Sequence, residues 1–242
     1  NMGWMNDSLD YLEVDPFFRK GSHDKFTFSM CYAFSENYIL PISHDEVVHG
    51  KKSLLDKAPV AYEDKFSNFK AFLGYMFAHP GKKLTFMGVD IAQFIEWDEE
   101  RQLDWFLLLY PKHSFSQRYV KELNKYYKST PALWQNDCDW NGFRWHVVDD
   151  NTNNVFAFSR IDNSGKEVLV VSNFSGQILK GYEIGVDTWG SYKISLNSDA
   201  KKYDGTALQN RNLKTLNKKK NNFQYTLSVN IPPYATMYIE KK

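Results

Sequence analysis

Residues 41–55 read PISHDEVVHGKKSLL and join a short apolar run to a dense polar cluster. The run at 38–43, YILPIS, has the composition of a β-strand. The polar cluster that follows it consists of His44, Asp45, Glu46, His49, Lys51 and Lys52. Parallel barrel enzymes place their acid, base and charge-stabilising groups at the carboxyl ends of strands. The stretch therefore predicts a strand that delivers functional side chains to a site at its carboxyl end.

Strands and helices alternate on either side of this stretch. Residues 64–79 carry apolar side chains at helical spacing, and the Pro80-Gly81 pair that follows predicts the end of that helix. Residues 83–87 form the next expected strand. A second helix is predicted to begin with a capping box of Ser114 and Gln117. Strand, helix, strand and helix in this order indicate a parallel α/β unit.

The pattern changes near residue 137, after which short alternating runs are separated by turn signals. No helix is expected there, and an antiparallel β-sandwich is the predicted architecture. We therefore expect two domains, an α/β domain over 1–137 and an all-β domain over 138–242. The predicted strands are 143–148, 155–161, 168–174, 191–196, 225–231 and 236–240.

Composition is that of an ordinary globular protein and excludes several classes of function. A formal net charge of +1 gives no electrostatic reason to expect binding to nucleic acid or to a membrane surface. No apolar run approaches the ~18 residues of a membrane span, and no signal peptide is recognisable, so we expect a cytoplasmic protein. The two cysteines, Cys31 and Cys138, lack the spacing of metal ligands, and no metal site is predicted.

Several segments together resemble one family, the α-amylase superfamily in the form found in 1,4-α-glucan branching enzymes. The match is closest over 41–55, which is similar to the fourth conserved region of that superfamily and contains its seventh barrel strand. The similarity keeps the family's order along nearly the whole chain. The other segments that resemble it are NMGWMNDSLDY at 1–11, YAFSEN at 32–37, AHPGKKL at 78–84, EW at 96–97, LDW at 103–105, VVSNF at 170–174 and IPPYAT at 231–236.

The resemblance implies a fold. It predicts that residues 1–137 form the C-terminal portion of a (β/α)₈ TIM barrel, namely the end of the sixth unit and units seven and eight. Residues 138–242 are expected to form the family's C-terminal β-sandwich. The family's nucleophilic Asp and acid/base Glu lie on the fourth and fifth barrel strands, which have no counterpart in these residues. We therefore expect the chain to be the C-terminal piece of a larger enzyme and to be inactive alone.

The resemblance also implies an activity, the cleavage of α-1,4-glucan chains and their transfer to form α-1,6 branches in glycogen biosynthesis. Asp45 matches the family's third carboxylate, a transition-state stabiliser, and His44 matches the neighbouring catalytic His. Glu46, Trp4 and Met5 are expected to help bind the α-1,4-glucan. No cofactor is implied.

Other interpretations remain open at this point. The chain could come from another α-amylase-family hydrolase or transferase, which would share the His44-Asp45 pair. It could also be a glucan-binding module without catalysis. Packing in the interior is an equal alternative for Trp4 and Met5, and packing against the β-domain is the favoured role of Trp97. Because part of a barrel leaves strand edges and an apolar face uncovered, we expect the chain to self-associate, swap or rearrange.

Overall fold

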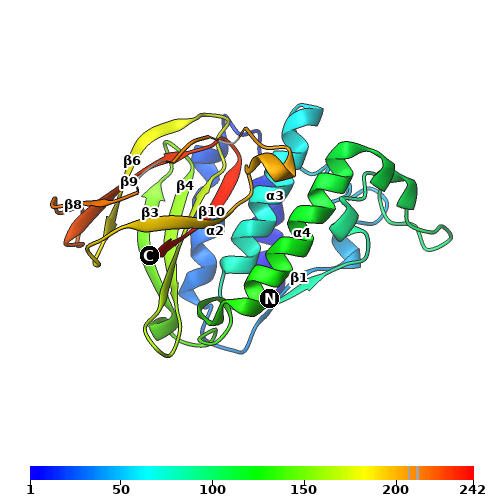
Figure 1. Ribbon diagram of the computed structural model, residues 1–242. Coiled ribbons are helices and arrows are strands. Elements are labelled where there is room, and N and C mark those ends of the chain that lie inside the picture. Colours follow the sequence, from blue (N-terminus) through cyan, green and yellow to red (C-terminus); the bar gives the residue numbers. More distant parts are fainter. Residues whose placement is uncertain (207, 211–212) are drawn as a thin grey trace.

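The computed structural model describes residues 1–242 except 207 and 211–212. Its helical part and its β-rich part lie side by side, and helices cover one face of a large sheet (Figure 1). The long helices are α1 (Met2–Glu13), α3 (Tyr62–Ala78) and α4 (Pro111–Ser129). The short helical segments are η1 (Arg19–Ser22), α2 (Asp24–Thr27), η2 (Phe28–Cys31), η3 (His44–Glu46), η4 (Val89–Ile91), η5 (Trp105–Leu109), η6 (Pro131–Leu133), η7 (Trp140–Gly142) and η8 (Lys201–Tyr203).

The predicted strand–helix–strand unit is present. Strands β1 (Ile39–Ile42) and β2 (Lys82–Thr85) pair in parallel, and α3 connects them. The helix ends one residue before the predicted 79, where His79 has an extended conformation and Pro80 follows. These two strands are the whole of this small sheet, and the described residues close no barrel.

Helix α4 was predicted with the wrong beginning. It starts at Pro111, which occupies the first helical turn, and its N-cap is Tyr110 without a side-chain capping bond. Proline suits this position because it lacks a backbone N–H and its φ is already helical. The expected capping box at Ser114 and Gln117 therefore lies inside the helix.

The C-terminal part is built from antiparallel sheets, as predicted, but it also contains the short helical segments η7 and η8, where no helix was expected. One sheet has five strands in the order β3-β4-β5-β10-β7, and the other has three in the order β6-β9-β8. Strands β6 and β8 were not predicted, since β6 contains two glycines, one of them Gly181 with a φ of 63°. The bounds are β3 (Phe143–Asp150), β4 (Val155–Ile161), β5 (Glu167–Asn173), β6 (Leu179–Val186), β7 (Tyr192–Asn197), β8 (Thr215–Leu216), β9 (Tyr225–Ile231) and β10 (Ala235–Lys241).

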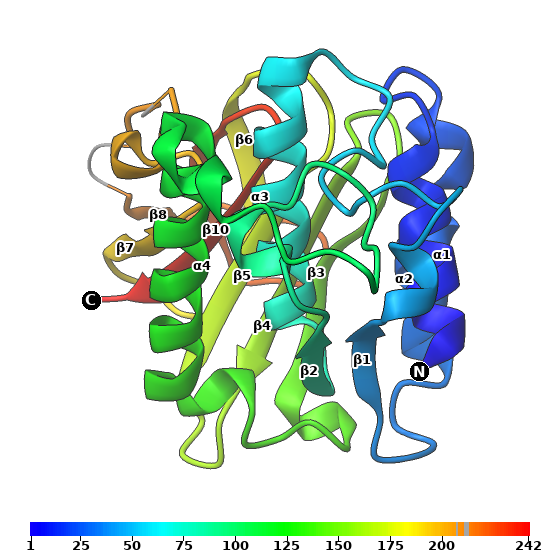
Figure 2. The ribbon, with the colours of Figure 1, turned by 90° about the vertical axis from the view of Figure 1, so that its right-hand side faces the viewer.

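The five-stranded sheet is buried on both faces. In β5, Leu169 and Val171 belong to the core between the two sheets, whereas Val168 and Val170 belong to the core under the helices. Successive side chains of a strand point to opposite faces, so the apolar run in β5 reflects this double burial. Figure 2 shows α3 and α4 in front of the large sheet. The β-rich part thus closes a core of its own on one face of this sheet only.

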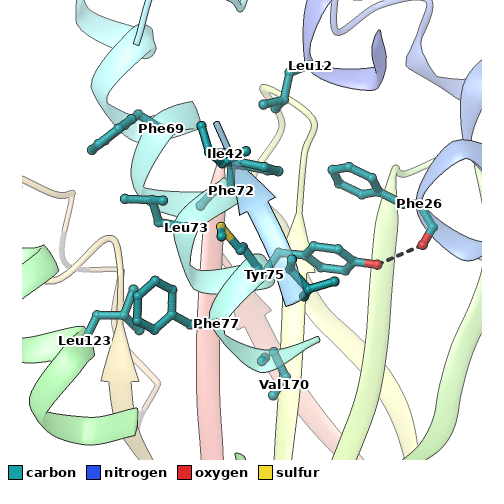
Figure 3. Close-up of a cluster of buried hydrophobic side chains, with 14 of the residues drawn as sticks. Leu12, Phe26, Ile42, Phe69, Phe72, Leu73, Tyr75, Phe77, Leu123 and Val170 are labelled. Carbon is teal, nitrogen blue, oxygen red and sulfur yellow. Dashed lines mark hydrogen bonds between the residues drawn. The ribbon is translucent and has the colours of Figure 1, made fainter. Parts of the chain in front are cut away.

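A large aromatic cluster joins the helices to this sheet. Phe72, Leu73 and Tyr75 of α3 meet Ile42 of β1 and Val170 of β5, as Figure 3 shows. The Tyr75 hydroxyl donates to the Phe26 carbonyl at 2.9 Å. The core is therefore continuous across residue 137, the expected domain boundary.

Helix α3 approaches β10 closely because it carries a glycine. A Cβ at Gly74 would lie 2.7 Å from the Tyr119 hydroxyl oxygen and 2.8 Å from the Thr236 Cβ. Thr236 donates to the Ala71 carbonyl at 2.8 Å, and Tyr238 donates to the Gly74 carbonyl at 2.5 Å.

Two buried arginines tie the two parts together. Arg19 donates to the carbonyl of Phe174 at 2.9 Å and to the Asn68 side chain at 2.9 Å. Arg160 of β4 donates to the carbonyl of Ala78 at 2.7 Å and to the Asp137 carboxylate at 2.7 Å. A buried cation needs such partners, because an unpaired one is costly. Each arginine therefore bonds the helical part to the β-rich part, Arg19 at Phe174 and Arg160 at Ala78.

Candidate functional site

The candidate site lies at the carboxyl end of β1. Leu40 and Ile42 are buried, which anchors the strand, and Ser43 continues it in an extended conformation. The chain then turns into the short helix η3, in which the Val47 N–H donates to the His44 carbonyl at 3.0 Å. This turn brings His44 and Asp45 to the surface, as the sequence predicted for a polar cluster after a strand.

His44 and Asp45 form a pair. The His44 Nε2 lies 2.8 Å from the Asp45 Oδ1, and their side chains are 55% and 59% exposed. The Ser43 hydroxyl donates to the Asp45 Oδ2 at 3.5 Å. An exposed carboxylate with free lone pairs can accept hydrogen bonds from hydroxyl groups of a ligand.

Aromatic rings from beyond β2 stand beside this pair. The Phe86 ring lies 5.9 Å from the His44 ring, and the Trp97 ring lies 6.2 Å from it at 80°. Phe86 and Trp97 themselves make an edge contact at 5.1 Å. Trp97 thus packs beside His44 at the strand ends, which corrects the expectation that it packs against the β-domain. The carboxyl ends of both parallel strands contribute to one site.

Glu46 points to a different neighbourhood. Its carboxylate lies 3.7 Å from the Lys51 ammonium and 3.9 Å from the Lys57 ammonium. It lines a cavity of about 250 Å³ between η3 and α1, which Asp45 does not line. The structure therefore does not bring Glu46 and Asp45 to one pocket. The cavity's other lining residues are Asn6, Leu9, Asp10, Glu13, Gly50, Lys51 and Lys52.

Trp4 and Met5 lie beneath the site rather than in it. Their exposures are 1% and 0%. The Trp4 ring stacks near Phe72 at 6.2 Å and 19°, and the Met5 sulfur accepts from the Ser43 hydroxyl at 3.8 Å. These contacts match the packing alternative, since neither side chain is open to a ligand.

Of the other polar residues in the quoted stretch, His49 and Lys52 meet Glu96. The Lys52 N–H donates to Glu96 at 2.7 Å, and the His49 Nδ1 lies 3.5 Å from the same carboxylate. Hydrogen bonds from backbone N–H groups, foremost that of Lys52, lower the pKa of Glu96. Sequence reasoning missed this contact, because the residues are more than 40 positions apart.

The sequence also led to predictions about metal ligands, cysteines and membrane-spanning helices, and the structure bears on each of them. Among the described residues, no group of three or more His, Cys, Asp and Glu side chains could hold a metal ion. Cys31 and Cys138 are free and exposed. No helix in the described part of the chain is long and apolar enough to cross a membrane.

Comparisons with known proteins show which proteins this chain is similar to. Residues 145–242 match the family described as the alpha amylase C-terminal all-beta domain. A crystal structure of alpha-amylase from H. orenii superposes with a TM-score of 0.54 at 13% identity, covering 100% of this chain and 48% of that one. At this identity the likeness concerns the fold alone.

Sequence relatives are much closer. The 1,4-alpha-glucan branching enzyme GlgB of Halothermothrix orenii is 44% identical over 99% of this chain and 38% of its own length. The GlgB of Aquifex aeolicus is 48% identical over 99% of this chain and 38% of its own length. That of Photobacterium profundum is 46% identical over 100% of this chain and 34% of its own length. The chain spans little more than a third of these relatives, and along its whole length it is homologous to the C-terminal part of 1,4-alpha-glucan branching enzymes.

Proposed function

We propose that this chain belongs to an enzyme that cleaves α-1,4-glucan chains and transfers them to form α-1,6 branches in glycogen biosynthesis. The observation that carries the proposal is identity of 44–48% to three branching enzymes over 99–100% of the chain. The exposed His44–Asp45 pair at the end of β1 adds a chemical reason. The substrate class is α-1,4-glucan, and the reaction class is glycosyl transfer with retention.

The proposal includes an assignment of the fold. We assign β1 and β2 to the seventh and eighth strands of a (β/α)₈ barrel, with α1 as part of the sixth unit. Their parallel pairing and the connecting α3 support this assignment, because neighbouring barrel strands are linked in this way. Residues 1–137 would then be barrel and 138–242 the C-terminal β-domain, although the two share a core.

Asp45 has a defined role in this proposal. A retaining mechanism uses a nucleophilic carboxylate and an acid/base carboxyl about 5–5.5 Å apart, and its transition state resembles an oxocarbenium ion. Both groups would come from strands outside these residues. Asp45 would accept hydrogen bonds from hydroxyls of the distorted glucose, and His44 would donate to the same sugar. Such bonds accelerate the reaction only if they strengthen as the ring gains positive charge.

The remaining site residues support rather than react. Glu46 is turned toward Lys51 and Lys57, so we assign it to shaping the loop and the cavity beside α1. Met5 packs under the strand end, where its sulfur accepts from the Ser43 hydroxyl, and Trp4 packs near Phe72. Their contribution to glucan binding would therefore be indirect.

Self-association of the isolated chain is also part of the proposal. Ile39 in β1 and Leu84 in β2 are 50% and 46% exposed, and in the described part of the chain each of these strands pairs with another strand along one edge only. Exposed apolar side chains on open strands favour pairing with another copy. Light scattering should give a mass above that of the monomer at micromolar concentrations, and a strict monomer would contradict this point. The cytoplasmic location stays a prediction for cell fractionation to test.

Turnover by the isolated chain and by a complete enzyme that carries it tests the function. Branching of amylose lowers its iodine absorbance and produces α-1,6 anomeric signals without new reducing ends. We expect the complete enzyme to do this and the 242-residue chain to do nothing. Sustained branching by the pure chain would require a nucleophile within these residues. Net release of reducing ends by the complete enzyme would favour a hydrolase.

A further inference from the structure

A buried lysine holds the loop 44–53, which carries the candidate site. Lys57 is 1% exposed, and its ammonium donates to the Lys51 carbonyl at 2.7 Å and to the Glu13 carboxylate at 3.2 Å. The Glu46 carboxylate lies 3.9 Å away. An ammonium group has three protons to satisfy, and a buried one is tolerated only with such partners. Lys57 therefore joins the end of α1 to both ends of the segment 46–51.

The same loop is held from the other side by Glu96. Its carboxylate accepts from the Lys52 N–H at 2.7 Å. Gly50 and Lys52 have positive φ angles of 80° and 63°, and the backbone N–H groups of residues 50–52 together lower the pKa of Glu96. Backbone N–H groups arranged in this way form a concave binding place for an anion. In this protein the anion is the side chain of Glu96. The segment that follows β2 therefore holds the loop that follows β1 by hydrogen bonds to its backbone.

Two further bonds support this second attachment. The Trp97 N–H donates to the Val47 carbonyl at 2.8 Å, and the Ser53 hydroxyl donates to the Phe94 carbonyl at 2.8 Å. Residues 44–53 are thus fastened at Val47, Lys51, Lys52 and Ser53. Among the contacts described, neither Lys57 nor Glu96 has an ion pair or hydrogen bond with His44 or Asp45.

We propose that Lys57 and Glu96 are positioning residues, which act together to hold the loop 44–53 so that His44 and Asp45 keep one orientation at the carboxyl end of β1. This inference rests on the proposed function for its catalytic consequence. An error of about 1 Å in placing a catalytic group can cost a factor of ~100 in rate. Loops with exposed side chains are otherwise mobile, and the His44–Asp45 pair is exposed.

The experiment uses the 242-residue chain and needs no turnover. Amide hydrogen exchange reports the opening of residues 44–53. The NMR signals of the His44 ring report its place beside Phe86 and Trp97, because those rings shift nearby protons. The variants are Lys57→Met and Glu96→Ala. Lys65→Met is the matched control, since Lys65 also bonds a carbonyl and a carboxylate, those of Ala58 and Asp56, but none in the loop.

Both test variants should raise exchange in 44–53 by about tenfold or more, the effect of losing one charge-assisted hydrogen bond. The His44 signals should move toward those of an unstructured histidine, and exchange in α3 and in the sandwich should stay unchanged. Lys65→Met should leave the loop and the ring signals as they are. If Lys57→Met fails to fold, Glu96→Ala decides, because its side chain is 30% exposed.

Unchanged loop exchange and unchanged His44 signals in Glu96→Ala would overturn the proposal. An equal change in the Lys65→Met control would overturn it too, because the effect would then be general destabilisation. These readouts do not depend on branching. If the chain proves not to belong to a branching enzyme, the exchange and NMR results still test the positioning role. If the positioning role proves wrong, the test of branching is unaffected.

Discussion

Separation of residues 138–242 from the rest of the chain should remove much of the stability of the β-sandwich. The sheet face that meets the helices would become open to water. At about 1.5 kcal/mol for each large apolar side chain, which is the low end of the usual range, six such side chains represent about 9 kcal/mol. The six side chains, all 0% exposed in the described structure, are Phe156, Phe158, Val168, Val170, Phe174 and Tyr238.

A loss of that size is comparable with the whole stability of a domain, about 5–15 kcal/mol. The Arg160 guanidinium would in addition lose the Ala78 carbonyl. The assay compares the 138–242 piece with the 1–242 chain by urea unfolding and by binding of an apolar dye. We expect the piece to bind the dye and to unfold at much lower urea, or without a cooperative transition.

Two neighbouring substitutions in β5 sharpen the test. Val170→Ala creates a cavity under the helices, and Val171→Ala creates one between the sheets. In the 1–242 chain both should cost about 1–3 kcal/mol. In the 138–242 piece only Val171→Ala should still matter, because the face at Val170 is already open. Equal unfolding midpoints for piece and chain, with no dye binding, would refute the reasoning.

Two further predictions concern buried ionisable groups. Burial lowers the pKa of His79 to about 3, so below pH 6.5 the unfolded chain takes up a proton that the folded chain does not. Stability should therefore fall by about 2 kcal/mol between pH 6.5 and pH 5, and His79→Gln should lose this part of the slope in urea unfolding; identical slopes would contradict it. Arg160→Met should cost about 3–5 kcal/mol, because Asp137 would stay buried with one of its ion-pair partners removed. A loss under about 1 kcal/mol in the same assay would show that the pair is not needed.

Local pattern was sufficient for much of the fold. The stripe over 64–79 and the Pro80-Gly81 pair located α3 within two residues at either end. The alternating runs after 137 located most strands of the sandwich. Strand β6 was missed because its glycines and exposed polar residues weaken the alternating pattern. The beginning of α4 was missed because Pro111 is a better signal than the capping box.

Contacts between segments far apart in the sequence could not be predicted from local pattern. The VLVV run at 168–171 already carried the information that its sheet is covered on both faces, but a run of this kind does not say what covers it. At the site, the positions of His44 and Asp45 follow from the end of β1. Trp97, which lies beside His44, and Glu96, which accepts from the Lys52 N–H, come from a segment more than 40 residues away. The spacing of residues along the chain does not predict contacts of this kind.

Asp45→Ala in a complete enzyme that carries this chain tests whether Asp45 stabilises the transition state of glucan transfer. The matched control is Asp10→Asn, at a carboxylate whose side chain is 60% exposed and paired with Lys25. Asp45→Ala should lower kcat by at least about 10²–10³-fold, with glucan binding and the unfolding midpoint nearly unchanged, because the bonds lost are those of the transition state. Asp10→Asn should branch amylose at a normal rate. Near-normal branching by Asp45→Ala, measured by iodine absorbance and α-1,6 signals, would contradict the account.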